Sequence, residues 1–402
     1  MPALDASLQE KLGRLDERGQ RRILRVTERD GVVARRGEAD LLSFSCNDYL
    51  GLTRHPEVIK AAQDALQLYG AGAGASRLIT GNNPLYNELE NLLAETKGTE
   101  AACVFGSGYL ANLGVIPALV GRGDLILADK LSHACMLDGA KLSGAKLLRF
   151  SHNDAEHCQQ LLATHRGNYN KCLLMTETIF SMDGDPAPLA ELSSLAEKFD
   201  SSLLTDDAHG LGFNPSTRRG EHGRGTLLAK PDQANPHPNP TLEREGNWVQ
   251  MGTLSKASGS YGGYVCGSAT LIDYIKTSAR SLIYSTALPP ATLAASISAL
   301  RIMQQEPERC AKPLRHAQYF TELLGLPLAQ SAIVPVLVGD SVKAMQLSQE
   351  LEDAGFLVAA IRPPTVPENT ARLRVAFSAL HTKEQIDALA AQLKKRGMPC
   401  AS

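Results

Sequence analysis

Between residues 101 and 267 the chain alternates short apolar runs with longer stretches of helical spacing. The clearest runs are residues 101–105, 124–129 and 171–176, and each has the length of a buried strand. Residues 110–120 lie between the first two runs and have the composition of a helix. This order of elements predicts an α/β fold with a mainly parallel sheet and helices on both of its faces.

The two ends of the chain follow other patterns. Residues 8–26 carry apolar positions at helical spacing among many arginines, and residues 356–360 and 373–377 are short apolar runs that predict strands. We expect both ends to form a smaller α+β domain over the sheet. The predicted units are an N-terminal helical segment that joins the small domain (1–45), a large domain (46–290) and a C-terminal small α+β domain (291–402).

One segment of the predicted large domain has neither a strand nor a helix pattern. Within residues 213–250, the stretch 231–240 is rich in proline and asparagine and has almost no apolar residue. Such a composition cannot bury enough surface to order itself, so it predicts an inserted exposed loop. A loop that binds a partner is the functional alternative.

Composition and charge narrow the class of protein further. The chain has 402 residues, enough for two domains, and its formal net charge of -2 gives no reason to expect nucleic acid or an anionic membrane as a partner. Its eight cysteines include no C-x-x-C pair, so neither a zinc site nor a disulfide framework is indicated. No apolar run approaches the ~20 residues that cross a bilayer, and residues 1–20 lack the apolar core of a signal peptide. We expect a cytoplasmic enzyme in a reducing compartment.

Two short segments at the ends of apolar runs carry the candidate chemistry. Residues 205–210 read Thr-Asp-Asp-Ala-His-Gly, and residues 252–256 read Gly-Thr-Leu-Ser-Lys. An enzyme that holds the aldehyde cofactor pyridoxal phosphate (PLP) needs a lysine on a rigid element and a carboxylate that keeps the pyridine nitrogen protonated. Lys256 and Asp206 are the candidates for these roles. The simpler alternative is that Asp206 caps a helix and Lys256 is a solvated surface lysine.

Other parts of a PLP site are expected at the ends of neighbouring strands, where open α/β sheets bind their ligands. Gly108 and Tyr109 lie where the helix after the first run begins, so backbone N–H groups there can face a phosphate. His133 follows the second run and can lay its imidazole on the pyridine ring. Ser181 follows the third run and can form a hydrogen bond with the cofactor or the substrate.

A pair of arginines marks the last predicted strand. Arg372 and Arg374 are two positions apart and therefore share one face. One of them can bind a carboxylate bidentately, and the other is then expected to be a solvated neighbour.

Taken together, the motifs resemble those of the α-oxoamine synthases, a family of fold-type-I PLP enzymes. The resemblance extends from about residue 47 to about residue 382. It rests on the segments 47–51 (NDYLG), 131–134 (LSHA), 180–185 (FSMDGD), 206–210 (DDAHG), 252–256 (GTLSK) and 284–290 (YSTALPP).

This resemblance implies a role for each matching residue. Lys256 forms the Schiff base with the cofactor, Asp206 partners the pyridinium nitrogen, and His133 stacks on the ring, with His209 as a fourth catalytic residue. The remaining implied contacts are Gly108, Tyr109, Ser181, His209 and Thr253 to the cofactor or substrate, Arg374 to the amino-acid carboxylate, and Arg25, Asn47 and Thr365 to the substrate.

Within the family, residues 361–367 and 370–374 resemble the members that join L-alanine to a pimeloyl thioester in biotin biosynthesis. The resemblance therefore implies a decarboxylating acyltransferase that uses pimeloyl-CoA or pimeloyl-acyl carrier protein, needs no metal and works as a homodimer. The nearest alternative is glycine C-acetyltransferase or another α-oxoamine synthase. More distant alternatives are an aminotransferase, a non-catalytic binding protein, and a metal-dependent hydrolase built from His133, Asp206, Asp207 and His209.

Overall fold

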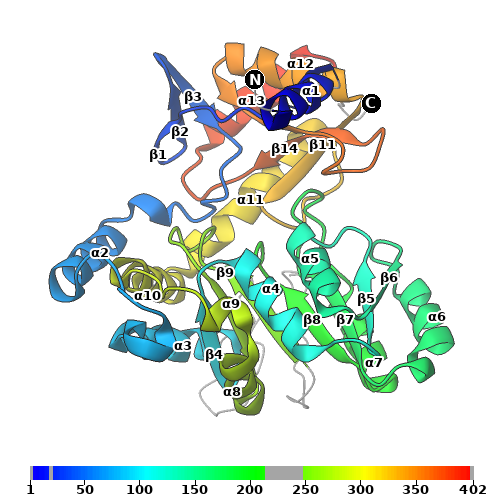
Figure 1. The fold of residues 1–402 in the computed structure, drawn as a ribbon. Coiled ribbons are helices and arrows are strands. Elements are labelled where there is room, and N and C mark those ends of the chain that lie inside the picture. Colours follow the sequence, from blue (N-terminus) through cyan, green and yellow to red (C-terminus); the bar gives the residue numbers. More distant parts are fainter. Residues whose placement is uncertain (1–2, 18–20, 213–247, 399–402) are drawn as a thin grey trace.

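The computed structural model describes residues 3–17, 21–212 and 248–398. Its elements form two bodies, one above the other in Figure 1, and α11 (Pro307–Leu324) runs between them. The lower body is built around a seven-stranded sheet, and the upper body around two smaller sheets. The loop predicted at residues 231–240 lies outside the described residues.

The large sheet confirms the α/β prediction. All of its strands run parallel except β10, which is antiparallel to both of its neighbours. The three predicted strands are present, each within one residue of its expected ends. In spatial order the strands are β4 (Ala101–Phe105), β10 (Gly263–Gly267), β9 (Trp248–Thr253), β8 (Ser202–Asp206), β7 (Cys172–Glu177), β5 (Leu125–Asp129) and β6 (Lys146–Phe150).

Successive residues of a strand point to opposite sides of a sheet, so this sheet has apolar side chains on both faces. Helices cover both faces. Leu125 and Leu127 of β5 pack in the core of one face, whereas Ile126 and Ala128 pack in that of the other. The first face is covered by α6 (Ala155–His165) and α7 (Leu189–Lys198), and the second by α4 (Gly108–Leu119), α5 (Ala134–Ser143) and α8 (Ala269–Ser278). The helix predicted at 110–120 is therefore α4.

A further group of helices packs beside the β4 edge of the sheet. Val58, Leu89 and Leu293 share one apolar core there. The helices concerned are α2 (Pro56–Tyr69), α3 (Pro84–Lys97) and α10 (Pro290–Gln305). The short helical segments of the lower body are η1 (Leu52–Arg54), η2 (Arg77–Gly81), η3 (Arg166–Asn168) and α9 (Arg280–Ile283).

The upper body joins the two ends of the chain. Strand β12 pairs parallel to β3, so the C-terminal part completes the N-terminal sheet. One sheet contains β1 (Glu28–Asp30), β2 (Val33–Arg36), β3 (Ala39–Ser43) and β12 (Phe356–Leu357), and the other contains β11 (Ile333–Gly339), β14 (Ala371–Ala376) and β13 (Ala359–Ile361). Helices α11, α12 (Ser341–Asp353) and α13 (Lys383–Lys395) pack on them. The division at residues 1–45, 46–290 and 291–402 stays a prediction.

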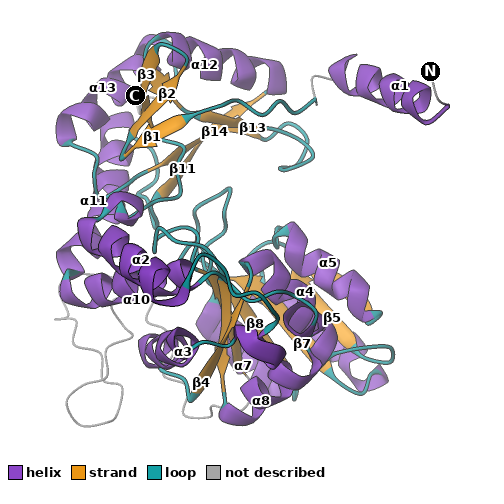
Figure 2. Ribbon diagram, turned by 60° about the vertical axis from the view of Figure 1, so that its left-hand side comes forward, coloured by secondary structure: helices purple, strands orange, loops and turns teal. Residues whose placement is uncertain are grey.

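Two predictions at the chain ends are confirmed only in part. The helix predicted over residues 8–26 is α1 (Ala3–Glu17), and residues 21–27 are not helical. The side chains described in α1 are all exposed, and Figure 2 shows this helix standing away from the other elements, so its apolar spacing has no core to match. The strand predicted at 356–360 is divided between two sheets. The carbonyl of Val358 accepts a hydrogen bond from Ser348 Oγ at 2.6 Å and so leaves the strand ladder.

Candidate active site

Several predicted site residues lie at the carboxyl edge of the large sheet. Asp206 is the last residue of β8, Thr253 is the last residue of β9, and Lys256 follows three positions later. Because β8 and β9 are parallel neighbours, their ends bring these side chains to one place. His133 is the N-cap of α5, and Ser181 lies in the segment after β7.

Asp206 is buried, and both of its carboxylate oxygens accept hydrogen bonds. Asn112 Nδ2 donates to Oδ2 at 3.0 Å, and the backbone N–H of Ala208 donates to Oδ1 at 3.0 Å. Burial raises the pKa of Asp206, and the charge of Lys256 and these two hydrogen bonds oppose the rise. Residues 208–212 form turns, so no helix begins after Asp206 within the described residues. The simpler alternative, in which this buried carboxylate caps a helix, is therefore wrong for the described part of the chain.

Lys256 is likewise not a solvated surface lysine. Its Nζ lies 2.7 Å from Nε2 of His209, and Nδ1 of His209 lies 2.7 Å from the hydroxyl of Tyr49. Burial lowers the pKa of Lys256, and the negative charges of Asp206 and Glu177 oppose this only in part. Burial also holds the pKa of His209 well below its usual value, so its imidazole is neutral at pH 7. A neutral ring between an amine and a hydroxyl can accept a hydrogen bond on one side and donate one on the other.

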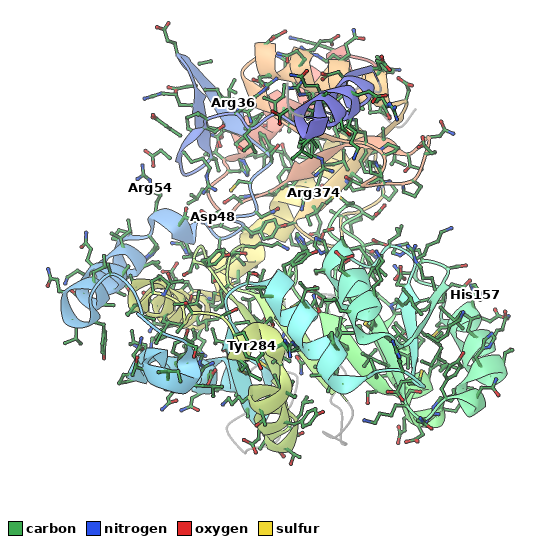
Figure 3. The ribbon with its side chains drawn as sticks, viewed as in Figure 1. Arg36, Asp48, Arg54, His157, Tyr284 and Arg374 are labelled. Carbon is green, nitrogen blue, oxygen red and sulfur yellow. The ribbon has the colours of Figure 1, made fainter. Side chains whose placement is uncertain are left out.

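Arg374 reaches this group of residues from β14 of the upper body, and Figure 3 labels it where the two bodies meet. Its Nε donates to the backbone oxygen of Ser181 at 2.6 Å, its Nη1 to Asn47 Oδ1 at 3.2 Å, and its Nη2 to the Tyr49 hydroxyl at 3.3 Å. A guanidinium carries five N–H donors, so two remain for a carboxylate. Asn47 and Arg374, both predicted to contact the substrate, are therefore direct neighbours.

The environment of Arg372 differs from the one that the sequence predicts. The sequence predicts a solvated neighbour of Arg374, but the side chain of Arg372 is only 4% exposed. It forms an ion pair with Asp183, and its Nη1 lies 3.5 Å from the backbone oxygen of Met182. Both arginines therefore bind the segment after β7, Arg374 at Ser181 and Arg372 at the two following residues.

The turn before α4 is packed closely against the sheet. A Cβ on Gly263 would lie 2.4 Å from the carbonyl carbon of Ser107, and a Cβ on Gly108 would lie 3.3 Å from the Cβ of Thr253. The Ser107 Oγ accepts a hydrogen bond from the backbone N–H of Leu110 at 3.2 Å and caps the helix. The first N–H groups of a helix have no partner within it, so those of Gly108 and Tyr109 can bind a phosphate. The Tyr109 side chain points elsewhere, since its hydroxyl donates to Asp138 at 2.6 Å.

Unpaired buried polar atoms surround the candidate groups. Ser132 Oγ, Asn112 Oδ1 and Glu177 Oε1 have no hydrogen-bond partner among the described residues. Ser132 precedes His133, Asn112 binds Asp206, and Glu177 accepts backbone hydrogen bonds from His133 and Ser181. Orphaned groups of this kind are expected where a polar ligand completes a site. The donors and carboxylates at the sheet edge therefore fit PLP.

Sequence reasoning assigned no role to three residues that the structure brings into the site: Tyr49, Asn112 and Glu177. Asn112 is fully buried in α4, and Glu177 is 3% exposed at the end of β7. Burial raises the pKa of Glu177 well above its usual value. The signal in the sequence is a polar residue inside an otherwise apolar run, because such a residue is costly to bury without a partner.

Two predicted substrate residues do not join this group. Arg25 is half exposed, and its Nη1 lies 3.1 Å from Glu352 Oε1 of α12. Thr365 is exposed in the loop between β13 and β14, and its N–H donates to the backbone oxygen of Arg362 at 3.1 Å. Neither residue contacts Lys256, Asp206 or Arg374 in the described part of the chain.

The described residues offer no metal centre and no membrane span. No group of three or more His, Cys, Asp or Glu side chains within 3–17, 21–212 and 248–398 is arranged to hold a metal ion. Across the same ranges, every helix is too short or too polar to cross a bilayer. Among the cysteines described there, Cys46, Cys103, Cys135, Cys158, Cys172 and Cys266 are free thiols, and all of these except Cys46 are buried.

A mainly parallel sheet with a lysine and a carboxylate at its carboxyl edge defines a PLP-dependent enzyme of fold type I. The family model for class I and II aminotransferases matches residues 39–393. The 8-amino-7-oxononanoate synthase of Methylobacterium nodulans is 53% identical over 397 residues, which cover 98% of each chain. The chain therefore belongs to the PLP-dependent class I and II aminotransferase family and, within it, to the 8-amino-7-oxononanoate synthases.

Solved structures agree with this placement. A variant of a serine palmitoyltransferase from S. paucimobilis, solved with a bound PLP–myriocin aldimine, superposes with a TM-score of 0.84 at 29% identity and covers 99% of this chain and 98% of its own. An 8-amino-7-oxononanoate synthase from Francisella tularensis has a TM-score of 0.70 at 26% identity and covers 89% of this chain and 98% of its own. The cofactor predicted from the sequence is thus confirmed as PLP.

Proposed function

We propose that this enzyme condenses L-alanine with a pimeloyl thioester to form 8-amino-7-oxononanoate, carbon dioxide and a free thiol. The name of its close relatives supports this product. The observation that carries the proposal is the continuous line of polar contacts from Lys256 through His209 and Tyr49 to Arg374. It supports the proposal because an amine and a guanidinium lie at its two ends, as the recognition of an α-amino acid would require.

The residues at the sheet edge would hold the cofactor. We infer that the N–H groups of Gly108 and Tyr109 bind its phosphate, that Asp206 partners its ring nitrogen, and that Lys256 binds its aldehyde carbon. His133 is proposed to cover one face of the ring, and Ser181, His209 and Thr253 to contact its polar groups. When bound, PLP supplies a protonated ring that withdraws electrons from the amino-acid Cα.

Lys256 is proposed to take the proton from the Cα of alanine. Because burial lowers the pKa of Lys256, its unprotonated amine is more available than that of a surface lysine. His209, which is neutral and in contact with both Lys256 Nζ and Tyr49, can keep the amine oriented during this transfer. The proton stays on Lys256 within reach of the same carbon.

Arg374 is proposed to bind the alanine carboxylate with its two remaining N–H donors. The deprotonated Cα then attacks the thioester carbonyl carbon, a C–C bond forms, and the C–S bond breaks to release the carrier as a thiolate, which takes a proton from solvent to become the free thiol. The bond between Cα and the carboxylate breaks next, carbon dioxide leaves, and Lys256 returns a proton to the carbon. Arg374 must therefore release the carboxylate in this last step.

For the second substrate, Asn47 is proposed to act beside Arg374, whereas Arg25 and Thr365 remain predictions. Arg25 could reach a substrate only after exchanging its ion pair with Glu352. The carrier of the pimeloyl group is either coenzyme A or acyl carrier protein, and kinetic comparison of the two thioesters will distinguish them.

The working unit is proposed to be a homodimer in a reducing, cytoplasmic location. The support for a dimer is an exposed apolar surface around Thr286, which pairs with Ser76 beside η2. Leu78, Ile79 and Tyr284 are 60%, 76% and 72% exposed there. In a dimer built through this surface, the Thr286 hydroxyl of one copy could reach the site of the other copy. Mixing inactive Lys256→Ala subunits with inactive Thr286→Ala subunits should then restore activity, whereas a fully active monomer would contradict the proposal.

The test of the reaction is an assay of the PLP-loaded enzyme with two amino acids and three thioesters. We expect thiol release with alanine and pimeloyl-CoA or pimeloyl-acyl carrier protein, and carbon dioxide in equal amount. Faster thiol release with glycine and acetyl-CoA would favour glycine C-acetyltransferase instead. Amino-group transfer without thiol release would favour an aminotransferase.

A further inference from the structure

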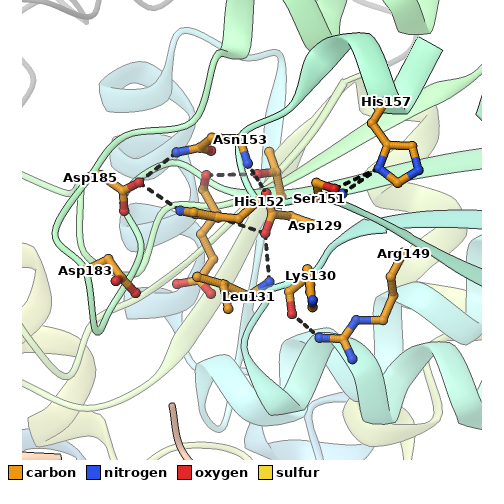
Figure 4. Close-up of polar contacts among 12 residues, drawn as sticks. Asp129, Lys130, Leu131, Arg149, Ser151, His152, Asn153, His157, Asp183 and Asp185 are labelled. Atoms are coloured by element: carbon orange, nitrogen blue, oxygen red, sulfur yellow. Dashed lines mark hydrogen bonds and ion pairs between the residues drawn. The ribbon is translucent and has the colours of Figure 1, made fainter. Parts of the chain in front are cut away.

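A second group of charged residues lies outside the site, between three strand ends of the large sheet. His152, which follows β6, contacts Asp129 at the end of β5 and Asp185 in the segment after β7. Asn153 adds two hydrogen bonds to the same carboxylates (Figure 4). We name Asp129, His152, Asn153 and Asp185 the His152 clamp.

The contacts require His152 to be charged. Its Nδ1 lies 3.0 Å from Asp129 Oδ1, and its Nε2 lies 2.8 Å from Asp185 Oδ2. Carboxylates only accept hydrogen bonds, and a neutral imidazole has a single N–H, so donation to both needs an imidazolium. Burial would lower the pKa of His152, but the hydrogen bonds and charges of Asp129 and Asp185 outweigh burial and raise it to about 10.

On one side, the clamp holds the turn that carries His133. Asp129 is completely buried, and its Oδ1 also accepts the N–H of Leu131 at 2.7 Å. Its Oδ2 accepts the N–H of Asn153 at 2.8 Å. Asp129 therefore ties the residues just before His133 to the loop of His152.

On the other side, the clamp holds the base of the segment 178–187, which we name the Ser181 loop. Ile179 and Pro186 form an isolated β-bridge there, and the N–H of Phe180 donates to the backbone oxygen of Asp185 at 2.9 Å. The ring of His152 also packs edge-on against Phe180, with centroids 4.4 Å apart. The clamp thus fixes the two strands of the loop base.

The tip of the Ser181 loop is held by the upper body. Arg374 binds the Ser181 carbonyl, and Arg372 pairs with Asp183. A Cβ on Gly184 would lie 2.2 Å from the backbone oxygen of Ile333 in β11, so the tip lies directly on that sheet. A shift of the loop base would consequently move the group to which Arg374 is attached.

We propose that His152 is a positioning residue for this site, which fixes the Ser181 loop relative to His133 and thereby sets where Arg374 receives the substrate carboxylate. The inference rests on the proposed function only for the identity of the substrate. The clamp itself contacts neither Lys256 nor Asp206, so it acts through the two loops.

The test compares His152→Ala with His157→Ala. His157 is a matched control because its Nδ1 contacts only Ser151, at 3.1 Å to N and 2.9 Å to Oγ, and no clamp carboxylate. Hydrogen exchange is measured on the cofactor-free and the PLP-loaded proteins. In His152→Ala we expect amides of residues 130–133 and 178–187 to exchange at least about tenfold faster, with α8 unchanged, and in His157→Ala we expect wild-type rates.

Kinetics and spectra supply the second readout. In His152→Ala the KM for L-alanine should rise about tenfold, with a smaller change in kcat and in the KM for the thioester, and the visible absorption maximum of bound PLP should shift. If His152→Ala does not fold, Asp185→Asn removes one charge with little change of shape and should move the same quantities in the same direction.

Wild-type exchange rates in both loops, or a purely thermal destabilisation with an unchanged KM and spectrum, would overturn the proposal. Hydrogen exchange is measured without substrate, so it tests the role of the His152 clamp even if the wild-type enzyme proves to use another amino acid. In that case only the proposed function fails.

Discussion

The sheet edge and the upper body contribute to the site by different physical means. Asp206 and Thr253 are terminal strand residues, so backbone pairing between β8 and β9 sets their positions. Arg374 comes from a separate sheet and reaches the site only through hydrogen bonds to Ser181, Asn47 and Tyr49. The positions of the sheet-edge residues are therefore fixed by the register of neighbouring strands, whereas the position of Arg374 depends on contacts between residues far apart in the chain. Substitutions in the two regions should consequently have different signatures.

The largest effect is expected at Lys256. Lys256→Ala removes the amine that we propose to bind the cofactor and to move the proton, so turnover should fall by at least about 10⁴-fold, with the fold intact. Steady-state kinetics and circular dichroism would measure both quantities. Lys60→Ala, an exposed lysine of α2, is the matched control and should behave as wild type. Turnover within tenfold of wild type in Lys256→Ala would end the assignment of the sheet edge as the catalytic side.

Asp206→Asn should have the next largest effect. An amide has nearly the same shape, and its oxygen can still accept the N–H of Ala208, while its NH2 group can donate to Asn112 Oδ1 if the Asn112 amide turns over. It cannot, however, hold the pyridinium proton by charge. We expect kcat to fall by about 10²–10³-fold while some PLP is retained, as shown by visible absorbance. The exposed carboxylate Asp64 provides the control Asp64→Asn. Normal kcat in Asp206→Asn would show that this residue has another task.

The sequence predicts the contacts of the sheet edge better than those of the upper body. The meeting of Lys256, Asp206 and His209 at one place could be predicted because apolar runs predict strands, and strand ends of a parallel sheet meet at one edge. The pairing of Arg372 with Asp183 was missed because two arginines on one strand face are equivalent until the Ser181 loop is placed beside them. Tyr49 and Asn112 were missed for a similar reason, since their partners are 160 and 94 positions away in the chain.

Arg374→Lys probes the upper body. Lysine keeps the charge but loses the forked donors, so the contacts with Ser181, Asn47 and a substrate carboxylate cannot be made together. The KM for L-alanine should rise by on the order of tenfold to thirtyfold, with kcat less affected, in steady-state assays. A comparable fall in kcat with no change in KM would show that Arg374 acts like the sheet-edge residues and would contradict the comparison.

The His152 clamp should leave a pH signature in stability. Its folded pKa of about 10 lies above the ordinary value of 6.5, so its contribution is fully present below pH 6.5 and is lost as the pH rises toward 10. The free energy of unfolding of the wild type, relative to His152→Ala, should fall by about 1 kcal/mol per pH unit in this window. Urea unfolding at several pH values measures the difference. A difference that is constant from pH 7 to pH 10 would mean that the imidazole is not charged.

The smallest effect is expected for the stretch 231–240, which belongs to neither side of the comparison. Its composition predicts an exposed loop without a site residue, so its deletion should change kcat/KM by less than about twofold. Gel filtration and kinetics of the deletion variant would test this. Loss of the proposed dimer with a preserved fold would favour the alternative of a partner-binding loop.

The unpaired cysteines have a practical consequence for covalent labelling. Burial raises the pKa of Cys103, Cys135, Cys158 and Cys266 to about 12, so at neutral pH almost none of these thiols is in the reactive thiolate form. A cysteine introduced at an exposed position of α12 would react with a maleimide in preference to these four. A dye attached there would report any movement of the upper body relative to the sheet edge while the four buried thiols are left in place.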